Sequence, residues 1–316
     1  MKKLICMLLT ALMLLSACAL AEGANVAALK GPTAMGMVKL MQDDAGANYN
    51  FEICASADEI TPRLMQGEID IAALPANLAA VLYNRSEGKI QALAVNTLGV
   101  LYIAERGDSV HAVSDLAGRT IYSAGKGSTP EFALNYILSA NGLTPGEDVT
   151  IEYKSEHSEC LAALMADERA VAMLPQPFLT TAMGKAADMR VALDLTEEWD
   201  KLQSEGGSAM ITGVVVARAD YAKENPEAVN AFLEGYAASV EFTNANVAEA
   251  AQIIGQYDIV PAEVAEKALP GCKICFISGA EMKEKLSGYL QVLSDADPAS
   301  VGGALPGDDF YYGAEG

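Results

Sequence analysis

The sequence is poor in the residues on which catalytic and nucleic-acid-binding sites most often depend. Its 316 residues include two histidines, one tryptophan and 21 lysines and arginines against 42 aspartates and glutamates, which gives a formal net charge of −21 at pH 7. A surface of this sign repels a phosphate backbone, so we expect no nucleic-acid partner. His111 and His157 alone give little support to a two-histidine metal site or a Ser–His relay. The sequence therefore predicts no catalytic residue, no metal site and no cofactor.

Long hydrophobic runs are also lacking. The apolar run Leu4–Leu15 follows two lysines and is shorter than a membrane-spanning helix, which is typical of a signal peptide. No later run reaches membrane-spanning length. Removal of residues 1–17 would take away two lysines and no acidic residue, so the mature chain would carry a formal net charge of −23. This acidity favours solubility, and any anion site must be made locally.

The end of the apolar run carries a further signal. Leu15-Ser-Ala-Cys18 resembles the lipobox of bacterial lipoproteins, in which the chain is cut before the cysteine and the cysteine is lipidated. An ordinary signal peptide cut near Ala21 is the alternative. We expect residues 1–17 to be removed, Cys18 to be lipidated and residues 18–24 to form a tether. The protein would then be anchored to the outer face of the bacterial cell membrane.

Few cysteines remain for other chemistry. Cys272-Lys-Ile-Cys275 has the spacing of only half a zinc or redox motif, without a second pair or a nearby histidine. A buried or incidental pair is the favoured interpretation. Disulfides form outside the cytoplasm, but the sequence assigns none among Cys54, Cys160, Cys272 and Cys275.

Short apolar runs alternate regularly with amphipathic ones. The first hundred residues predict strand, helix, strand, helix, strand, and the pattern restarts near residue 114. This order indicates mainly parallel sheets covered by helices, an α/β fold. The expected strands are 25–29, 49–54, 69–74, 91–96 and 99–104 in the first run, then 120–122, 149–153, 170–174 and 188–195 in the second.

One loop occurs twice. Residues 28–33 read A-L-K-G-P-T and residues 124–129 read A-G-K-G-S-T, and both precede an amphipathic helix. A helix start of this kind has unpaired N–H groups and the positive end of the helix dipole, which suit an anionic or strongly polar group. A plain strand-to-helix connection is the alternative.

A second pair of segments repeats at a similar offset. Residues 64–75, L-M-Q-G-E-I-D-I-A-A-L-P, align with residues 164–175, L-M-A-D-E-R-A-V-A-M-L-P. Because the two K-G-x-T loops lie in matching order, the sequence predicts two similar α/β units in series. Ligands of open α/β sheets bind outside the carboxyl ends of the strands, so we expect four loops to converge on one cleft.

The last third of the chain is expected to be mostly helical. The β-branched run Met210–Ala217 predicts a strand that returns to the first sheet. Trp199 is interpreted as a packing residue. The aromatic tail Pro306–Tyr312 is expected to dock on a lobe.

Together these motifs resemble a known family. The lipobox, K-G-P-T-A-M-G, Q-G-E-I-D-I-A-A-L-P-A-N, D-L-A-G-R-T-I, the second Leu-Pro loop and N-P-E-A-V-N-A-F are similar to the solute-binding lipoproteins of ABC importers in the nitrate/sulfonate/taurine group. The resemblance implies a type II periplasmic-binding-protein fold, in which two α/β lobes are joined by two crossing strands and followed by a helical C-terminal segment. It places lobe 1 at residues 25–100 plus 213–316 and lobe 2 at residues 101–212, with crossings near 97–103 and 211–217.

The same resemblance, carried over position by position, implies a set of ligand-binding residues. They lie in loops rich in backbone amides, hydroxyls and carboxamides, which suit a polar solute. The segment Lys154–His157 is interpreted as a surface loop outside this set. The expected ligand-binding residues are Lys30, Gly31, Thr33, Asn77, Asn96, Lys126, Gly127, Ser128, Thr129, Gln176 and Thr212.

The implied function is capture of a small solute and its delivery to an ABC permease by a monomeric protein that is not an enzyme. Two lysines and two helix starts favour an anionic organic solute, such as a sulfonate or taurine-like molecule. A thiamine-type pyrimidine precursor or another heteroaromatic is the alternative ligand. An enzyme on the same fold is the less favoured interpretation, because the relatives that make menaquinone or thiamine pyrimidine precursors act in the cytoplasm, whereas residues 1–18 are expected to export this chain. A further alternative is a sensor lipoprotein that presents its solute to a receptor rather than to a permease.

Overall fold

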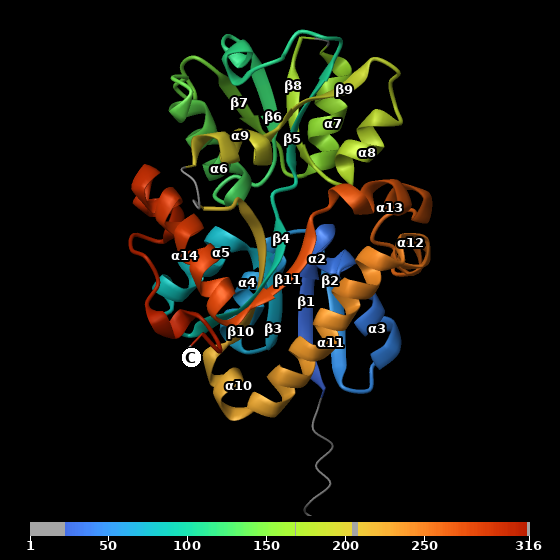
Figure 1. Ribbon diagram of the computed structural model, residues 1–316, viewed down its shortest axis with the longest axis vertical. Coiled ribbons are helices and arrows are strands. Elements are labelled where there is room, and N and C mark those ends of the chain that lie inside the picture. Colours follow the sequence, from blue (N-terminus) through green and yellow to red (C-terminus); the bar gives the residue numbers. More distant parts are fainter. Residues whose placement is uncertain (1–22, 168, 204–207, 315–316) are drawn as a thin grey trace, which may run out of the picture.

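The computed structural model describes residues 23–167, 169–203 and 208–314. The expected signal peptide, Cys18 and residues 18–22 of the expected tether lie outside the described residues. Within the described part of the chain, no helix combines the length and the apolar character that a membrane crossing requires. Two α/β lobes lie one above the other in Figure 1, with two passages of chain between them.

The first lobe is built on a six-stranded sheet. Its strands are β1 (Ala24–Leu29), β2 (Tyr49–Cys54), β3 (Ile71–Pro75), β4 (Ile90–Leu98), β10 (Ile211–Arg218) and β11 (Ile274–Ser278), in the order β11-β4-β10-β3-β1-β2. β1 is parallel to β2 and β3, whereas β10 is antiparallel to β3 and β4. β1 begins at Ala24, which the sequence analysis assigned to the tether, because Ala24 pairs with Tyr49 of β2.

The second lobe repeats this arrangement with five strands. They are β5 (Leu101–Arg106), β6 (Thr120–Ser123), β7 (Thr150–Tyr153), β8 (Val171–Pro175) and β9 (Met189–Asp194), in the order β7-β6-β8-β5-β9. This order matches β2-β1-β3-β10-β4 of the first sheet. In each sheet the antiparallel fourth strand has just crossed from the other lobe. The two similar α/β units expected from the repeated motifs are confirmed.

Helices cover both sheets. Those of the first lobe are α2 (Pro32–Met35), α3 (Val38–Asp44), α4 (Ala57–Gln66) and α5 (Ala76–Arg85), and those of the second are α6 (Thr129–Ala140), α7 (His157–Ala166), α8 (Phe178–Met183) and α9 (Leu195–Leu202). The C-terminal helices are α10 (Ala219–Glu224), α11 (Pro226–Ala245), α12 (Val247–Gln256), α13 (Ala262–Ala268) and α14 (Gly279–Ala296). Strands buried on both faces read as nearly continuous apolar runs, which is why β3 and β8 are so alike in sequence.

Two crossings join the lobes side by side. The first passes from β4 to β5 through Gly99 and Val100, and the Gly99 amide donates to the carbonyl of Met210, beside the second crossing, at 2.8 Å. A Cβ on Gly99 would lie 1.9 Å from Thr196 Oγ1, so only glycine fits there. Val100 has a φ of 138°, a conformation rare for a β-branched residue, which its packed surroundings enforce.

The second crossing differs from its expected position at residues 211–217. Those residues form β10, which is hydrogen-bonded on both edges inside the first sheet, so the chain crosses before Ile211. Ile211 and the three valines 214–216 of this run are fully buried and therefore belong in a sheet interior. The C-terminal segment also contains a strand that the sequence analysis missed, β11, at the edge beside β4.

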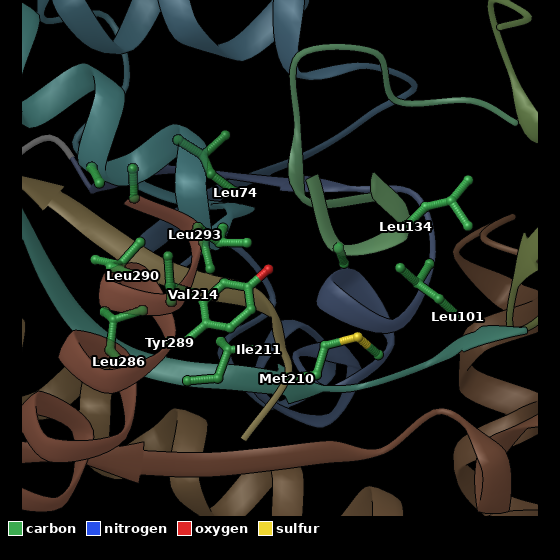
Figure 2. Packing of buried hydrophobic residues seen from close by; sticks show 14 of the residues in the cluster. Leu74, Leu101, Leu134, Met210, Ile211, Val214, Leu286, Tyr289, Leu290 and Leu293 are labelled. Carbon is green, nitrogen blue, oxygen red and sulfur yellow. The ribbon is translucent and has the colours of Figure 1, made fainter. Parts of the chain in front are cut away.

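The C-terminal helix α14 packs against both lobes. One continuous apolar cluster contains Leu286 and Tyr289 of α14 together with Leu134 of the second lobe (Figure 2). Trp199 is fully buried, as expected, with ring centroids 5.3 Å from Tyr289 and 4.8 Å from Tyr136.

The aromatic tail docks as expected. Phe310 and Tyr311 are buried on the first lobe, and the Tyr312 amide donates to a β4 carbonyl at 2.9 Å. The four described cysteines are free thiols. The Cys272–Cys275 pair is thus not a disulfide, and Cys272 is fully buried.

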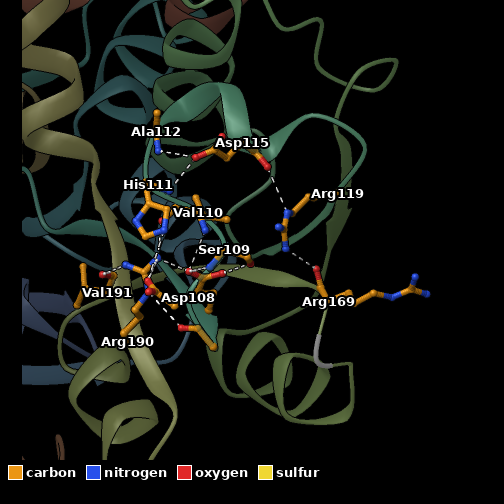
Figure 3. Close-up of polar contacts among 12 residues, drawn as sticks. Asp108, Ser109, Val110, His111, Ala112, Asp115, Arg119, Arg169, Arg190 and Val191 are labelled. Atoms are coloured by element: carbon orange, nitrogen blue, oxygen red, sulfur yellow. Dashed lines mark hydrogen bonds and ion pairs between the residues drawn. The ribbon is translucent and has the colours of Figure 1, made fainter.

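A buried carboxylate fixes the far end of the second lobe. Glu105 at the end of β5 accepts from the Ser109 and Val110 amides at 3.0 Å and pairs with Arg190 of β9 at 2.5 Å. Arg190 also reaches Asp108 at 3.1 Å (Figure 3). Burial opposes ionisation of Glu105, but these hydrogen bonds and the Arg190 guanidinium outweigh it and lower its pKa.

Replacement of this carboxylate should destabilise the protein. Glu105→Ala leaves two backbone amides and the Ser109 hydroxyl without their acceptor and removes one partner of Arg190, so we expect a loss of about 3 kcal/mol in the free energy of unfolding measured with urea. Glu147→Ala, at an exposed loop position, should change it by less than about 0.5 kcal/mol. Equal effects of the two variants would contradict this role for Glu105.

Candidate functional site

A cleft of about 520 Å3 lies between the two lobes. Its walls are the loops after β1, β2 and β3 of the first lobe and those after β6, β7 and β8 of the second. Residues of the first crossing and Thr212 also line it. Parallel strands end at the same edge of each sheet, and the two edges face each other here.

The structure brings most of the expected ligand-binding residues to this cleft. Those that line it are Lys30, Thr33, Lys126, Gly127, Ser128, Gln176 and Thr212. The remaining four, Gly31, Asn77, Asn96 and Thr129, are not among the lining residues.

Two further loops line the cleft that the sequence analysis did not include. They are the loop of Ser56 and Asp58 after β2, and Lys154–His157 after β7, which was interpreted as a surface loop. The available signal was their position, since each directly follows a strand that is parallel to its neighbour in the same sheet. Six loops rather than four therefore converge.

Much of the polar chemistry of these loops is used by the fold itself. Thr33 donates to a β1 carbonyl, and Ser128 donates to a carbonyl of its own loop, both at 2.7 Å. Gln176 Oε1 accepts from the Thr180 hydroxyl at 2.7 Å, and Thr212 donates to two carbonyls at the end of β4 at 3.3 Å. The first three bonds are local and the Thr212 bonds join it to the neighbouring strand, so these side chains fix the shape of the cleft.

Asn77 and Thr129 join the two lobes. The Thr129 hydroxyl of α6 donates to Asn77 Oδ1 of α5 at 3.2 Å, and Asn77 Nδ2 donates to the carbonyls of Ser300, at 3.0 Å, and Gly127, at 3.5 Å. Both side chains are fully buried. They form an interlobe latch, by which we mean this Asn77–Thr129 pair, and the latch explains why neither residue faces the cleft.

Asn96 is also removed from the cleft by packing. It is fully buried on β4, and its Oδ1 accepts from the Thr97 hydroxyl at 3.1 Å. The space beside it is open only because residue 213 is glycine, where a Cβ would come within 2.4 Å of Asn96 Oδ1. Asn96 Nδ2 has no hydrogen-bond partner among the described residues.

The charges at the cleft come from opposing walls. Lys30 and Lys126 are exposed on the loops after β1 and β6, and Lys126 Nζ lies 5.7 Å from the ring centre of Tyr153. Lys154 is instead turned back along its sheet, where it contacts Glu152 at 3.2 Å and the Tyr122 ring at 5.0 Å. The two K-G-x-T loops therefore place one ammonium group on each side of the opening.

The remaining walls are largely apolar. They include Leu29, Leu78, Val100 and Phe178, and the Phe178 ring lies 5.1 Å from the ring of His157. Burial lowers the pKa of His157 to about 4, so its imidazole is neutral near pH 7, and its Nδ1 is buried without a partner among the described residues. The lining thus combines the ammonium groups of Lys30 and Lys126 and the carboxylates of Asp58 and Glu156 with apolar and aromatic side chains.

Fold and cleft together define the class of the protein. Two α/β lobes, joined by two crossings around an interlobe cleft, form a periplasmic-binding-protein fold of type II. The chain belongs to the family described as "ABC transporter, phosphonate, periplasmic substrate-binding protein", whose model matches residues 35–267. It is therefore a non-enzymatic solute-binding component of an ABC importer.

Solved structures agree with this assignment. An ABC transporter protein from Parabacteroides distasonis is 25% identical, with a TM-score of 0.75 over 92% of this chain and 98% of that chain. The aliphatic sulphonate-binding protein SsuA of Escherichia coli is 16% identical, with a TM-score of 0.70 over 87% of each chain. The alkanesulfonate-binding protein SsuA of Xanthomonas axonopodis pv. citri, bound to MOPS, is 16% identical, with a TM-score of 0.70 over 92% of this chain and 96% of that chain. No curated protein matches the sequence significantly.

The neutral state of His157 should make stability depend on pH. Because its pKa is lower in the folded protein than in the unfolded chain, its contribution is complete above about pH 6.5 and is lost as the pH falls towards 4. We expect His157→Gln to remove up to about 3 kcal/mol of this acid-induced loss in urea titrations at pH 7 and pH 4. The exposed His111→Gln is the matched control. Identical pH profiles for wild type and His157→Gln would refute the prediction.

The interlobe latch should stabilise the arrangement seen here. Thr129→Val keeps the shape of the side chain but leaves the buried Asn77 carbonyl without its donor, so we expect a loss of about 1–3 kcal/mol in unfolding free energy. Small-angle X-ray scattering should also show a larger radius of gyration because the lobes separate. Thr150→Val, at an exposed position of β7, should change neither quantity. A stable, equally compact Thr129→Val variant would show that the latch does not hold the lobes.

Proposed function

We propose that this protein captures a small organic anion, a phosphonate or sulfonate, in the interlobe cleft and delivers it to the permease of an ABC importer. The observation that carries the proposal is the placement of Lys30 and Lys126 on opposing walls. A positive charge on each lobe favours an anion that bridges the two lobes. The family description and the names of the sulfonate-binding neighbours support the same ligand class.

Capture works by closure of the two lobes. A ligand that touches both walls binds the closed arrangement more tightly than an open one and shifts the population towards it. Thr212, hydrogen-bonded to the end of β4 just before the first crossing, lies where such a hinge motion would be centred. Closure then presents the surfaces of both lobes together to the permease. In this proposal the protein acts as a monomer held at the membrane by a lipid on Cys18.

A flat heteroaromatic solute is the second candidate. The pair of rings formed by His157 and Phe178 in the cleft wall favours it, because aromatic rings stack on planar ligands. A neutral imidazole also offers a hydrogen-bonding group without charge. Binding of an anion should depend on Lys30 and Lys126, whereas binding of a neutral heteroaromatic should not.

A ligand panel separates the two candidates. We expect alkylsulfonates and alkylphosphonates, but not the corresponding neutral alcohols, to raise the melting temperature. At a hundred times the dissociation constant the stabilisation is about 2.7 kcal/mol. The variant Lys30→Ala/Lys126→Ala should weaken anion binding by about tenfold or more, as measured by calorimetry.

Lys185→Ala, an exposed lysine outside the cleft, is the matched control and should bind like wild type. Equal stabilisation by anionic and neutral solutes would contradict the anion proposal. A pyrimidine that stabilises most strongly, with affinity unchanged in the double lysine variant, would establish the second candidate instead.

A further inference from the structure

Three helices that begin at the cleft carry a carboxylate on their own N-terminal amides. Glu59 of α4 accepts from the Ser56 amide at 3.2 Å, and Glu159 of α7 accepts from the Ser155 amide at 2.9 Å. The shortest of these contacts is in α6, where Glu131 Oε2 accepts from the amide of Gly127 at 2.5 Å. The amides that the sequence suggests for an anionic ligand are therefore partly occupied by the protein's own anions.

Glu131 contacts the amide of a residue that lines the cleft, Gly127. Its contact reaches back beyond the first residue of α6 to Gly127, and the loop from Lys126 to Pro130 lines the cleft except at Thr129. Gly127 has a φ of 76°, which glycine adopts freely and which turns its amide towards the carboxylate. A ligand at this wall meets the α6 N-terminus with a full negative charge already on it.

The surroundings of Glu131 contain one compensating cation. Burial, followed by the charge of Glu131, raises the pKa of the Tyr153 phenol, and Lys126 lies over the ring of the same tyrosine. Tyr153 is thus flanked by an ammonium and a carboxylate. The other charges on this side of the lobe are the Lys154–Glu152 pair, Glu156 and Glu159.

The balance of these charges limits the negative charge that a ligand can carry at this wall of the cleft. A helix N-terminus is equivalent to about half a positive charge, which one carboxylate more than cancels. The wall then depends on Lys126 for its attraction to anions. A second negative charge on a ligand would find no further free amide at Gly127 and would be repelled by Glu131.

We propose that Glu131 is a specificity-determining residue that restricts the cleft to singly charged anionic groups, such as a sulfonate or a singly ionised phosphonate. This inference rests on the proposed function. In wild type, propane-1-sulfonate keeps its affinity as the pH rises, whereas propylphosphonate binds more weakly once its second proton is lost.

The test is the charge-only variant Glu131→Gln. Its amide oxygen still accepts from the Gly127 amide, so α6 keeps its cap while the negative charge disappears. Calorimetry at pH 9 with the two probes should show affinity for the sulfonate rising about tenfold and affinity for the dianionic phosphonate about a hundredfold. The ratio of the two affinities then shifts by about tenfold.

Glu227→Gln is the matched control, because it removes the same charge from the first turn of α11, outside the cleft lining. Its affinity ratio should equal that of wild type. If both probes bind wild type but the ratio is unchanged in Glu131→Gln, Glu131 is only a helix cap and the inference is wrong. If neither probe binds wild type, the proposed anionic ligand itself is contradicted, and the inference with it.

Discussion

The structure depends on the close pairing of the two crossings. The hydrogen bond from the Gly99 amide to the Met210 carbonyl joins them, and there is no room for a side chain at residue 99. Because the crossings lie side by side, each sheet receives an antiparallel strand from the other half of the chain. The carboxyl ends of two parallel sheets consequently face one cleft, and every ligand-facing loop owes its position to this connection.

Polar residues around the cleft serve two different purposes. Hydroxyl and carboxamide groups satisfy nearby backbone groups or join the lobes, as in the latch of Asn77 and Thr129. A buried polar group without a partner is costly, so these groups form hydrogen bonds within the protein rather than point into the cleft. Long flexible lysines keep their charge at the surface, and in the proposed function Lys30 and Lys126 supply the charge that attracts the solute. In the same proposal, the carboxylate of Glu131 on the Gly127 amide bears on selectivity.

Prediction from sequence succeeded where the signal was local and repeated. The strand–helix alternation gave the α/β class, and the paired K-G-x-T and Leu-Pro loops correctly indicated two similar units. It failed where a segment's role depends on distant neighbours. β11 is a short edge strand among helical patterns. Its partner β4 lies nearly two hundred residues earlier, so the sequence of β11 alone does not indicate the pairing. The loops after β2 and β7 lack the glycine-rich motif, so their place at the cleft was missed.

The sequence by itself determined the alternating elements, the doubled loops, the strongly acidic character and the buried role of Trp199, because periodicity, turn residues and composition act within a few residues of chain. Only the tertiary structure decided which of those loop residues face a ligand. Thr129 was expected to bind the ligand, yet its hydroxyl donates to Asn77 in the contact between the lobes. Glu131 lies in the first turn of α6, and only the folded chain shows that its carboxylate accepts from the amide of Gly127 at the cleft. Hydrogen bonds and charges are satisfied by whatever lies nearest in space, and that is fixed only when the two lobes come together.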